Sequence, residues 1–168
     1  NVSGNSTFTD NRAGADGGAI HARTIAGGQV TANVNGVGFS GNYAGDDGGA
    51  VYVGGDVDGY LAVVDSSFQD DSAAYYGGAG AVNFDDTSTT RITGSTFLNH
   101  TAIGDSGGAV SVEVTNGAIT FDDSVHFEGN SAGEAGGAAN VRAFGETDVI
   151  VGEVTFQGNS SVDNGGAM

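Results

Sequence analysis

Residues 39–53 read FSGNYAGDDGGAVYV, and this stretch decides the fold because it recurs along the chain. Each copy begins with a Phe, and a Gly-Gly-Ala tripeptide starts nine or ten residues later. The first residues of the six copies are Phe8, Phe39, Phe68, Phe97, Phe127 and Phe156. The paired glycines are Gly17, Gly18, Gly48, Gly49, Gly77, Gly78, Gly107, Gly108, Gly136, Gly137, Gly165 and Gly166. Successive Phe residues lie 31, 29, 29, 30 and 29 positions apart, so an internal repeat of about thirty residues organises the chain.

The residues after each Gly-Gly-Ala alternate between inward and outward side chains, as in Val51-Tyr52-Val53, which is the pattern of a strand with one buried face. A second extended run leads into each Phe, and no helical period occurs. One such coil of two or three short strands cannot bury its apolar face alone, so the coils must stack. The sequence therefore predicts an all-β fold, a right-handed parallel β-helix or solenoid of about six coils of 29–31 residues. Residues 1–168 would form a single repeat array.

Stacking the repeats would build two ladders and a corner. The six Phe rings would lie on one another through the interior. Three residues after each Phe, a polar side chain would form a second ladder, in which Asp71 and His100 replace Asn. The four amides of this ladder are Asn11, Asn42, Asn130 and Asn159. The Gly pairs would form the next corner, through positive φ or close backbone approach.

The charge of the chain limits its partners. Four basic side chains stand against 21 acidic ones, which gives a formal net charge of −17. Nucleic acid is excluded, because phosphate binding needs clustered Lys and Arg, and an anionic membrane surface is disfavoured for the same reason. No segment approaches the ~20 apolar residues of a membrane helix, so we expect no direct membrane insertion of this segment. The chain starts with Asn, and we expect it to be part of a longer chain or an assembly subunit.

Two short motifs resemble those of a known family. Gly-Gly-Ala is followed by Ile or Val in residues 17–20, 48–51 and 107–110. The pattern FxxN occurs in residues 8–11, 39–42, 127–130 and 156–159. These motifs resemble the GGA(I/L/V) and FxxN repeats of the polymorphic outer membrane proteins of chlamydial type. The chain departs from the pattern at Asp71, His100, Gly80, Ala139 and Met168. The resemblance covers nearly the whole chain and implies an autotransporter-passenger-like β-helix, displayed at a cell surface and active in adhesion.

Acidic side chains gather just before the Gly pairs, where stacked coils would bring them into a column along one edge. They are Asp16, Asp46, Asp47, Asp105, Glu134 and Asp163. Like charges at ~5 Å repel one another, so salt or a bound divalent cation would stabilise the column. A weaker candidate is the pair Asp56 and Asp58, which is similar to the start of a calcium loop without its later ligands. Ca²⁺ is the one cofactor that the sequence leaves open, and a solvated acidic surface is the alternative.

Catalytic residues are not expected. The outward positions after Gly-Gly-Ala include His21, Arg23, Tyr52, Asn83, Glu113 and Arg142. Arg23 and Arg142 take equivalent positions four coils apart, about 19 Å at ~4.8 Å per coil, which is too far to share one substrate bond. The sequence shows no nucleophile elbow and no triad spacing. It therefore favours a protein that is not an enzyme.

The function expected from the sequence is an extracellular or cell-surface β-helix, secreted and either structural or adhesive. It would display the loops 54–60 and 85–90 to a protein or glycan surface. One alternative is a filament subunit that self-associates end to end, since neither terminus carries a cap. The other is a β-helix that binds or cleaves polysaccharide. Such a site needs exposed aromatic side chains, and the candidates are Tyr52, Tyr60, Tyr75 and Tyr76.

Overall fold

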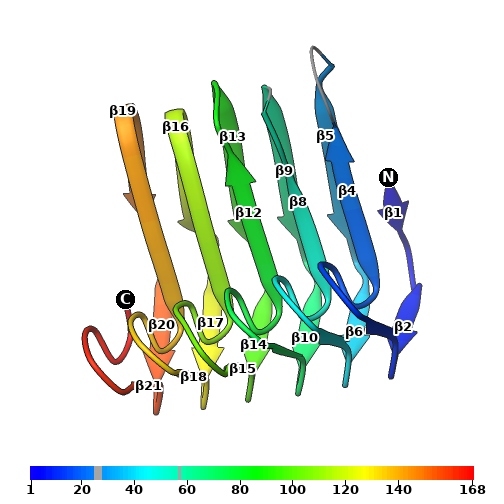
Figure 1. The fold of residues 1–168 in the computed structure, drawn as a ribbon, viewed down its shortest axis with the longest axis vertical. Coiled ribbons are helices and arrows are strands. Elements are labelled where there is room, and N and C mark those ends of the chain that lie inside the picture. Colours follow the sequence, from blue (N-terminus) through cyan, green and yellow to red (C-terminus); the bar gives the residue numbers. More distant parts are fainter. Residues whose placement is uncertain (25–27, 57) are drawn as a thin grey trace.

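The chain winds into a parallel β-solenoid of about five turns (Figure 1). The structure is a computed structural model and describes residues 1–24, 28–56 and 58–168. Within them every element is a β-strand, and none is a helix long and apolar enough to cross a membrane. The six sequence repeats give about five turns because only five strand segments follow a Gly pair. The predicted all-β solenoid is confirmed, with one turn fewer than expected.

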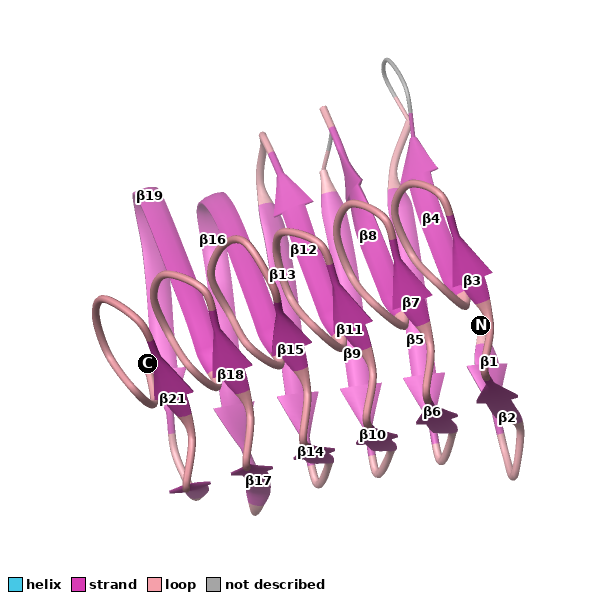
Figure 2. Cartoon of the chain, turned by 60° about the horizontal axis from the view of Figure 1, so that its bottom comes forward, coloured by secondary structure: helices cyan, strands magenta, loops and turns pink. Residues whose placement is uncertain are grey.

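Each turn places one strand segment on each of four faces (Figure 2). The first face holds β4 (Ile20–Thr24), β8 (Val51–Gly55), β12 (Gly80–Phe84) and the first halves of β16 (Val110–Asp122) and β19 (Ala139–Val151). The second face holds β1 (Val2–Ser3), β5 (Val30–Asn35), β9 (Gly59–Val64), β13 (Ser88–Thr93) and the second halves of β16 and β19. The third face holds β2 (Thr7–Thr9), β6 (Gly38–Ser40), β10 (Ser67–Gln69), β14 (Thr96–Leu98), β17 (Val125–Glu128) and β20 (Val154–Gln157). The fourth face holds β3 (Arg12–Ala13), β7 (Tyr43–Ala44), β11 (Ser72–Ala73), β15 (Thr101–Ala102), β18 (Ser131–Ala132) and β21 (Ser160–Ser161).

Four strand segments a turn is more than the two or three expected. The extended run leading into each Phe is not one strand, because a turn divides β5 from β6 and β9 from β10.

The expected display loops are also shorter than predicted. Residues 54, 55, 59 and 60 belong to β8 and β9, and Ser88–Thr90 belongs to β13. In β16 and β19 no loop separates the first face from the second.

The Phe residues share one register along the third face, since Phe39 pairs with Phe8 and Phe68, and Phe97 continues the same row. Neighbouring rings stack with centroids 4.6–5.3 Å apart and nearly parallel planes, from Phe8 through to Phe156. Offset stacking of this kind adds about 0.5–1.5 kcal/mol per pair beyond the burial of apolar area. The stack fixes the register of each coil on the next.

The polar ladder lies at the corner after the Phe stack and is buried in the central coils. The Asn42 side chain donates from Nδ2 to Asp71 Oδ1 at 2.7 Å and to the Phe8 carbonyl at 3.1 Å. In the same way Asn130 Nδ2 donates to Asn159 Oδ1 at 2.8 Å. Each coil also donates a backbone amide to the side chain in the next coil, as Asn42 does to Asp71. The ladder thus satisfies backbone groups that the corner removes from the sheets.

The two glycines of each pair meet different demands. The first, such as Gly48, has positive φ, between 58° and 73° over the six pairs. The second has ordinary φ but no room: a Cβ on Gly49 would collide with the Gly78 carbonyl oxygen of the next coil. Both of the reasons considered for a Gly corner therefore apply, one to each residue.

Candidate functional site

The outward side chains of the first face form a grid set by the strand register. One row runs His21, Tyr52, Ala81, Ser111 and Asn140, and the next runs Arg23, Gly54, Asn83, Glu113 and Arg142. Arg23 and Arg142 are therefore in equivalent positions four coils apart, as the repeat predicted. Because the large Tyr52 is followed by the small Ala81 and Ser111, the grid has a depression in its middle.

A groove of about 220 Å³ occupies this depression. It is lined by Asp47, Tyr52, Tyr76, Ala81, Val82, Asn83, Ser111, Glu113 and Arg142. The strands β12 and β16 supply the floor, and the corner before the Gly pairs supplies Asp47 and Tyr76. At the far end Arg142 Nη1 lies 3.2 Å from Glu113 Oε2, with both side chains partly exposed. Polar groups thus surround a hollow between two tyrosine side chains.

Asp47 is the groove's most perturbed acid. Its carboxylate accepts the backbone amide of Tyr76, which belongs to the following coil, at 3.1 Å. Burial raises the pKa of Asp47 to about 6, with added repulsion from Asp46, Asp16 and Asp105, while the Tyr76 amide opposes the shift. Burial and the neighbouring acids also raise the pKa of the Tyr52 hydroxyl.

On the N-terminal side of the groove, the exposed His21 ring lies beside Tyr52 in the same row. Their ring centroids lie 5.1 Å apart in a tilted arrangement. The His21 Nδ1 atom lies 3.9 Å from Asp16 Oδ2, so the imidazole faces the acidic corner. The rings of His21 and Tyr52 therefore lie next to the acidic side chains of the corner.

The six corner carboxylates fall into two adjacent columns, not the single column expected. Backbone hydrogen bonds between coils put Asp16 and Asp47 in line with Tyr76, and Asp46 in line with Tyr75. Asp105, Glu134 and Asp163 continue the second column beyond the tyrosines. Tyr75 interrupts the second column, and in the first column no acid follows Tyr76, so the acids do not form one continuous edge.

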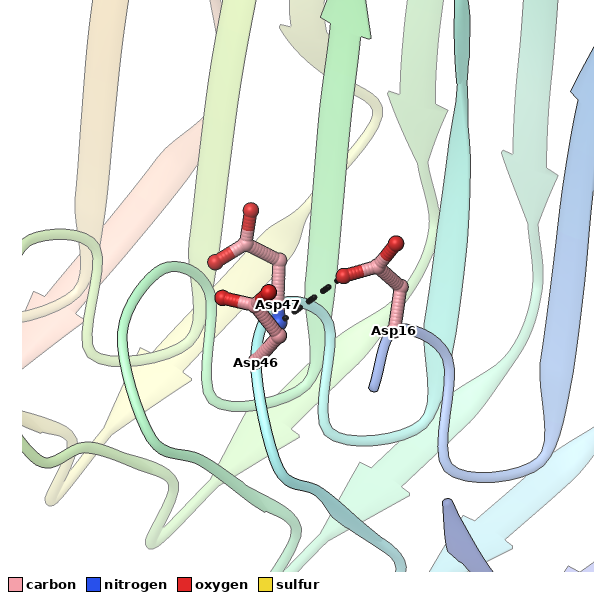
Figure 3. A group of neighbouring side chains, drawn as sticks. All are labelled: Asp16, Asp46 and Asp47. Atoms are coloured by element: carbon pink, nitrogen blue, oxygen red, sulfur yellow. Dashed lines mark hydrogen bonds between the residues drawn. The ribbon is translucent and has the colours of Figure 1, made fainter. Parts of the chain in front are cut away.

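Only Asp16, Asp46 and Asp47, among the described residues, bring three acidic ligand atoms together, all within 4.8 Å of one another (Figure 3). Two of them already have backbone roles. Asp16 Oδ1 accepts the Asp47 amide at 3.4 Å, as Asp47 does for Tyr76. Asp56 and Asp58 are exposed and join no such group in the described part of the chain. Val57, which lies between them, is outside the described residues.

The strand alternation predicts four of the groove residues, Tyr52, Asn83, Glu113 and Arg142, as outward positions. Tyr76 is also predicted as an aromatic candidate and Asp47 as a corner acid, but the sequence does not predict that either lies beside the strand face. The joining contact is the Asp47–Tyr76 hydrogen bond between coils. Tyr60 and Tyr75 do not line the groove: Tyr60 borders a separate hollow on the second face, and Tyr75 is exposed beside Tyr76. Tyr52 lines the groove but is only 8% exposed, because neighbouring side chains cover it, so the expectation of an exposed ring there is wrong.

Comparison with known proteins finds one family. The Chlamydia polymorphic membrane protein repeat matches residues 5–23 and 39–54. No curated protein and no solved structure matches the chain. Both matched segments contain a Phe and the Gly pair that follows it, so the match includes residues that build the corners and the interior stack. It supports a cell-surface location. The chain is thus a parallel β-solenoid that carries repeats of the polymorphic membrane protein type.

Proposed function

We propose that this chain is the display portion of a cell-surface adhesin, a rigid β-helix whose outer faces make the contacts and which performs no catalysis. One observation carries the proposal. The motifs that match the family repeat are used inside the solenoid, as the Phe stack, the polar ladder and the Gly corners. The outer positions are left to vary from coil to coil, as His21, Tyr52, Ala81 and Ser111 do in one row.

A scaffold of this kind suits recognition better than chemistry. Function on repeat solenoids is carried by side chains presented from rigid stacked elements. The first face presents Asn83, Glu113 and Arg142 in one row, and Glu113 is engaged by Arg142 in an ion pair. The other acid of the groove, Asp47, is also engaged by the protein, because its carboxylate accepts the Tyr76 backbone amide at 3.1 Å.

Adhesion of coated beads tests the proposal. Fluorescent beads coated with the whole chain are passed over cultured epithelial cells, immobilised matrix proteins and neutral polysaccharides, with albumin-coated beads as the control. We expect retention on at least one surface, competed by free chain, with no reducing ends released from any polysaccharide. Retention on none of the surfaces would overturn the adhesive role.

Two other outcomes separate the alternatives. Release of reducing ends would establish a polysaccharide-cleaving enzyme in place of an adhesin. Electron microscopy of the same preparation distinguishes a filament subunit, because end-to-end stacking of parallel coils would give regular rods. Single particles that still retain beads on a surface support the display function.

A further inference from the structure

We propose that the groove on the first face, lined by Tyr52, Tyr76, Asn83, Glu113 and Arg142, binds one sugar unit of a neutral glycan. The inference rests on the display function proposed above and names the chemistry of its ligand. It is argued from the size of the groove, its hydrogen-bonding groups and its charge.

The hydrogen-bonding groups suit a ring of hydroxyls, each of which can donate and accept. The carboxylates of Asp47 and Glu113 accept, the guanidinium of Arg142 donates, and the Asn83 amide does both. Ser111 adds a hydroxyl on the floor, held by the Asn140 amide at 3.3 Å. Apart from the two tyrosine rings, the only apolar lining comes from Ala81 and Val82. An apolar ligand would leave most of these polar groups without a partner.

The shape also favours a sugar ring. Sites for drug-sized ligands usually hold about 300–1,000 Å³, whereas this groove holds about 220 Å³. The half-buried Tyr76 lines the groove with the small Ala81, so a sugar ring can lie on the floor with its C–H faces against the Tyr76 ring, while Tyr52 is buried at the edge of the groove. Beyond the groove, the exposed His21 ring beside Tyr52 offers a further contact on the same face.

Charge disfavours an anionic ligand. Uronic acids, sulfates and phosphates would meet a protein of net charge −17 and the cluster of Asp16, Asp46 and Asp47 beside the groove. A cation would be attracted by the same acids, so trilysine is the comparator that separates attraction by charge from recognition of hydroxyl groups. Since Arg142 is paired with Glu113 at 3.2 Å, that end of the groove carries no net charge.

The direct test is titration of the whole chain with defined oligosaccharides by saturation-transfer NMR and calorimetry. The probes are trisaccharides of glucose, galactose, mannose, xylose and N-acetylglucosamine, with trigalacturonate, a heparin fragment and trilysine as charged comparators. We expect at least one neutral trisaccharide to bind with a dissociation constant on the order of 1 mM or tighter. Binding of a charged comparator alone, or of nothing, would overturn the inference.

Variants locate the site. Tyr76→Ala and Asn83→Ala should each weaken binding at least about tenfold, because each removes a wall or an amide of the groove. Tyr75→Ala is the matched control: Tyr75 is the next residue, is 51% exposed and does not line the groove. All three should melt at nearly the wild-type temperature. An equal loss in Tyr75→Ala, or no loss in the other two, would place the sugar elsewhere and contradict the proposal.

A pH titration gives a second signature. Because the pKa of Asp47 is raised to about 6, its carboxylate becomes a neutral carboxyl group as the pH falls through that value. Wild-type affinity should drop there, since a charged acceptor forms stronger hydrogen bonds than a neutral one. Asp47→Asn keeps an acceptor for the Tyr76 amide and should remove the pH step; a step that persists in Asp47→Asn counts against the assignment.

Bead adhesion that survives Tyr76→Ala with no sugar bound would reject the groove and leave the display function standing. Sugar binding without bead retention would support the groove and reject the adhesive display function.

Discussion

Two residues alter the chemistry of the buried ladder. Asp71 and His100 stand where other coils have Asn, and both side chains are fully buried. The Asp71 amide donates to His100 Nδ1 at 3.0 Å, so that nitrogen is an unprotonated acceptor and the imidazole is neutral. Within the described residues Asp71 Oδ2 and His100 Nε2 have no hydrogen-bond partner. A protonated Asp71 imitates the amide that it replaces, since its Oδ2 then carries a hydrogen as Asn Nδ2 does.

The protonation states follow from burial. It raises the pKa of Asp71 to about 7, with a further rise from neighbouring Asp70, although hydrogen bonds from Asn42 oppose the shift. Burial lowers the pKa of His100 to about 4. Between about pH 4 and 6.5 the unfolded chain has a charged Asp71 and a charged His100. Folding then releases one proton from His100 and takes one up at Asp71, so the two contributions to the pH dependence cancel.

Single substitutions should separate these opposed effects. With Asp71→Asn only His100 remains, and stability relative to wild type should fall as the pH drops from about 6.5 to 4, because the unfolded imidazole takes up a proton that the folded one refuses. With His100→Asn only Asp71 remains, and stability should fall as the pH rises from about 4 to 7. Each change should reach a few kcal/mol. Urea unfolding from pH 4 to 8 measures both changes. If the free energy of unfolding of the two variants varied with pH as it does in wild type, Asp71 and His100 would not both be neutral in the folded protein.

At the scale of the element, β12 contains a glycine, Gly80, beside an unfilled space in the core. Gly80 stands between Val51 and Val110 in register, and an apolar void of about 20 Å³ borders it in the core. A Cβ on Gly80 would meet nothing closer than the Val51 carbonyl oxygen at 3.8 Å, and the φ of Gly80 is not in the positive range. The void has room for a methyl group without strain.

Gly80→Ala should therefore stabilise the protein by about 0.5–1 kcal/mol, through lower unfolded-state entropy and better packing. Gly59→Ala is the matched control, another strand glycine without positive φ, but its Cβ would collide with the Phe84 ring. That variant should be less stable than wild type. Urea midpoints measure both. A loss of stability in Gly80→Ala would mean that the void is already filled in solution.

The elements most visible in the sequence are those that backbone geometry dictates. Phe39 and Gly48 recur because every coil needs the same ring and the same positive φ, so the stack could be predicted from spacing alone. The turn between β9 and β10 could not, because a hydroxyl and not a Gly or Pro signal holds it. There Ser66 Oγ accepts the Val37 amide at 3.2 Å and donates to the Val64 carbonyl.

The groove was predictable only in part for a similar reason. Period and register identify which strand residues face outward, and so Glu113 and Arg142 could be placed side by side. Tyr76 lies in a corner whose side-chain direction no repeat pattern fixes. Its place depends on the Asp47 carboxylate of the preceding coil, a contact between residues 29 positions apart that only the folded corner reveals.

In the molecule as a whole, acidic side chains greatly outnumber basic ones. The solenoid carries −17 formal charges, and its few cations are mostly engaged. Arg91 pairs with Asp123 at 3.1 Å and Arg142 with Glu113, while Arg12 lies over the Tyr43 ring at 4.1 Å. Coils stack in one direction, so acids such as Asp16 and Asp47 come close together. Self-repulsion of this kind destabilises a compact state and is screened by salt.

The melting temperature should therefore rise steadily from about 0.02 to 1 M NaCl, where the Debye length falls from tens of ångströms to about 3 Å. Measured with EDTA present, the rise reports screening alone. Calcium at equal ionic strength then tests the Asp16, Asp46 and Asp47 cluster: a gain beyond NaCl that Asp46→Asn removes would establish a divalent site there. Because Asp16 and Asp47 already accept backbone amides, we expect screening to account for nearly all of the effect. A melting temperature that does not respond to salt would show that the surface acids are too well solvated to oppose folding.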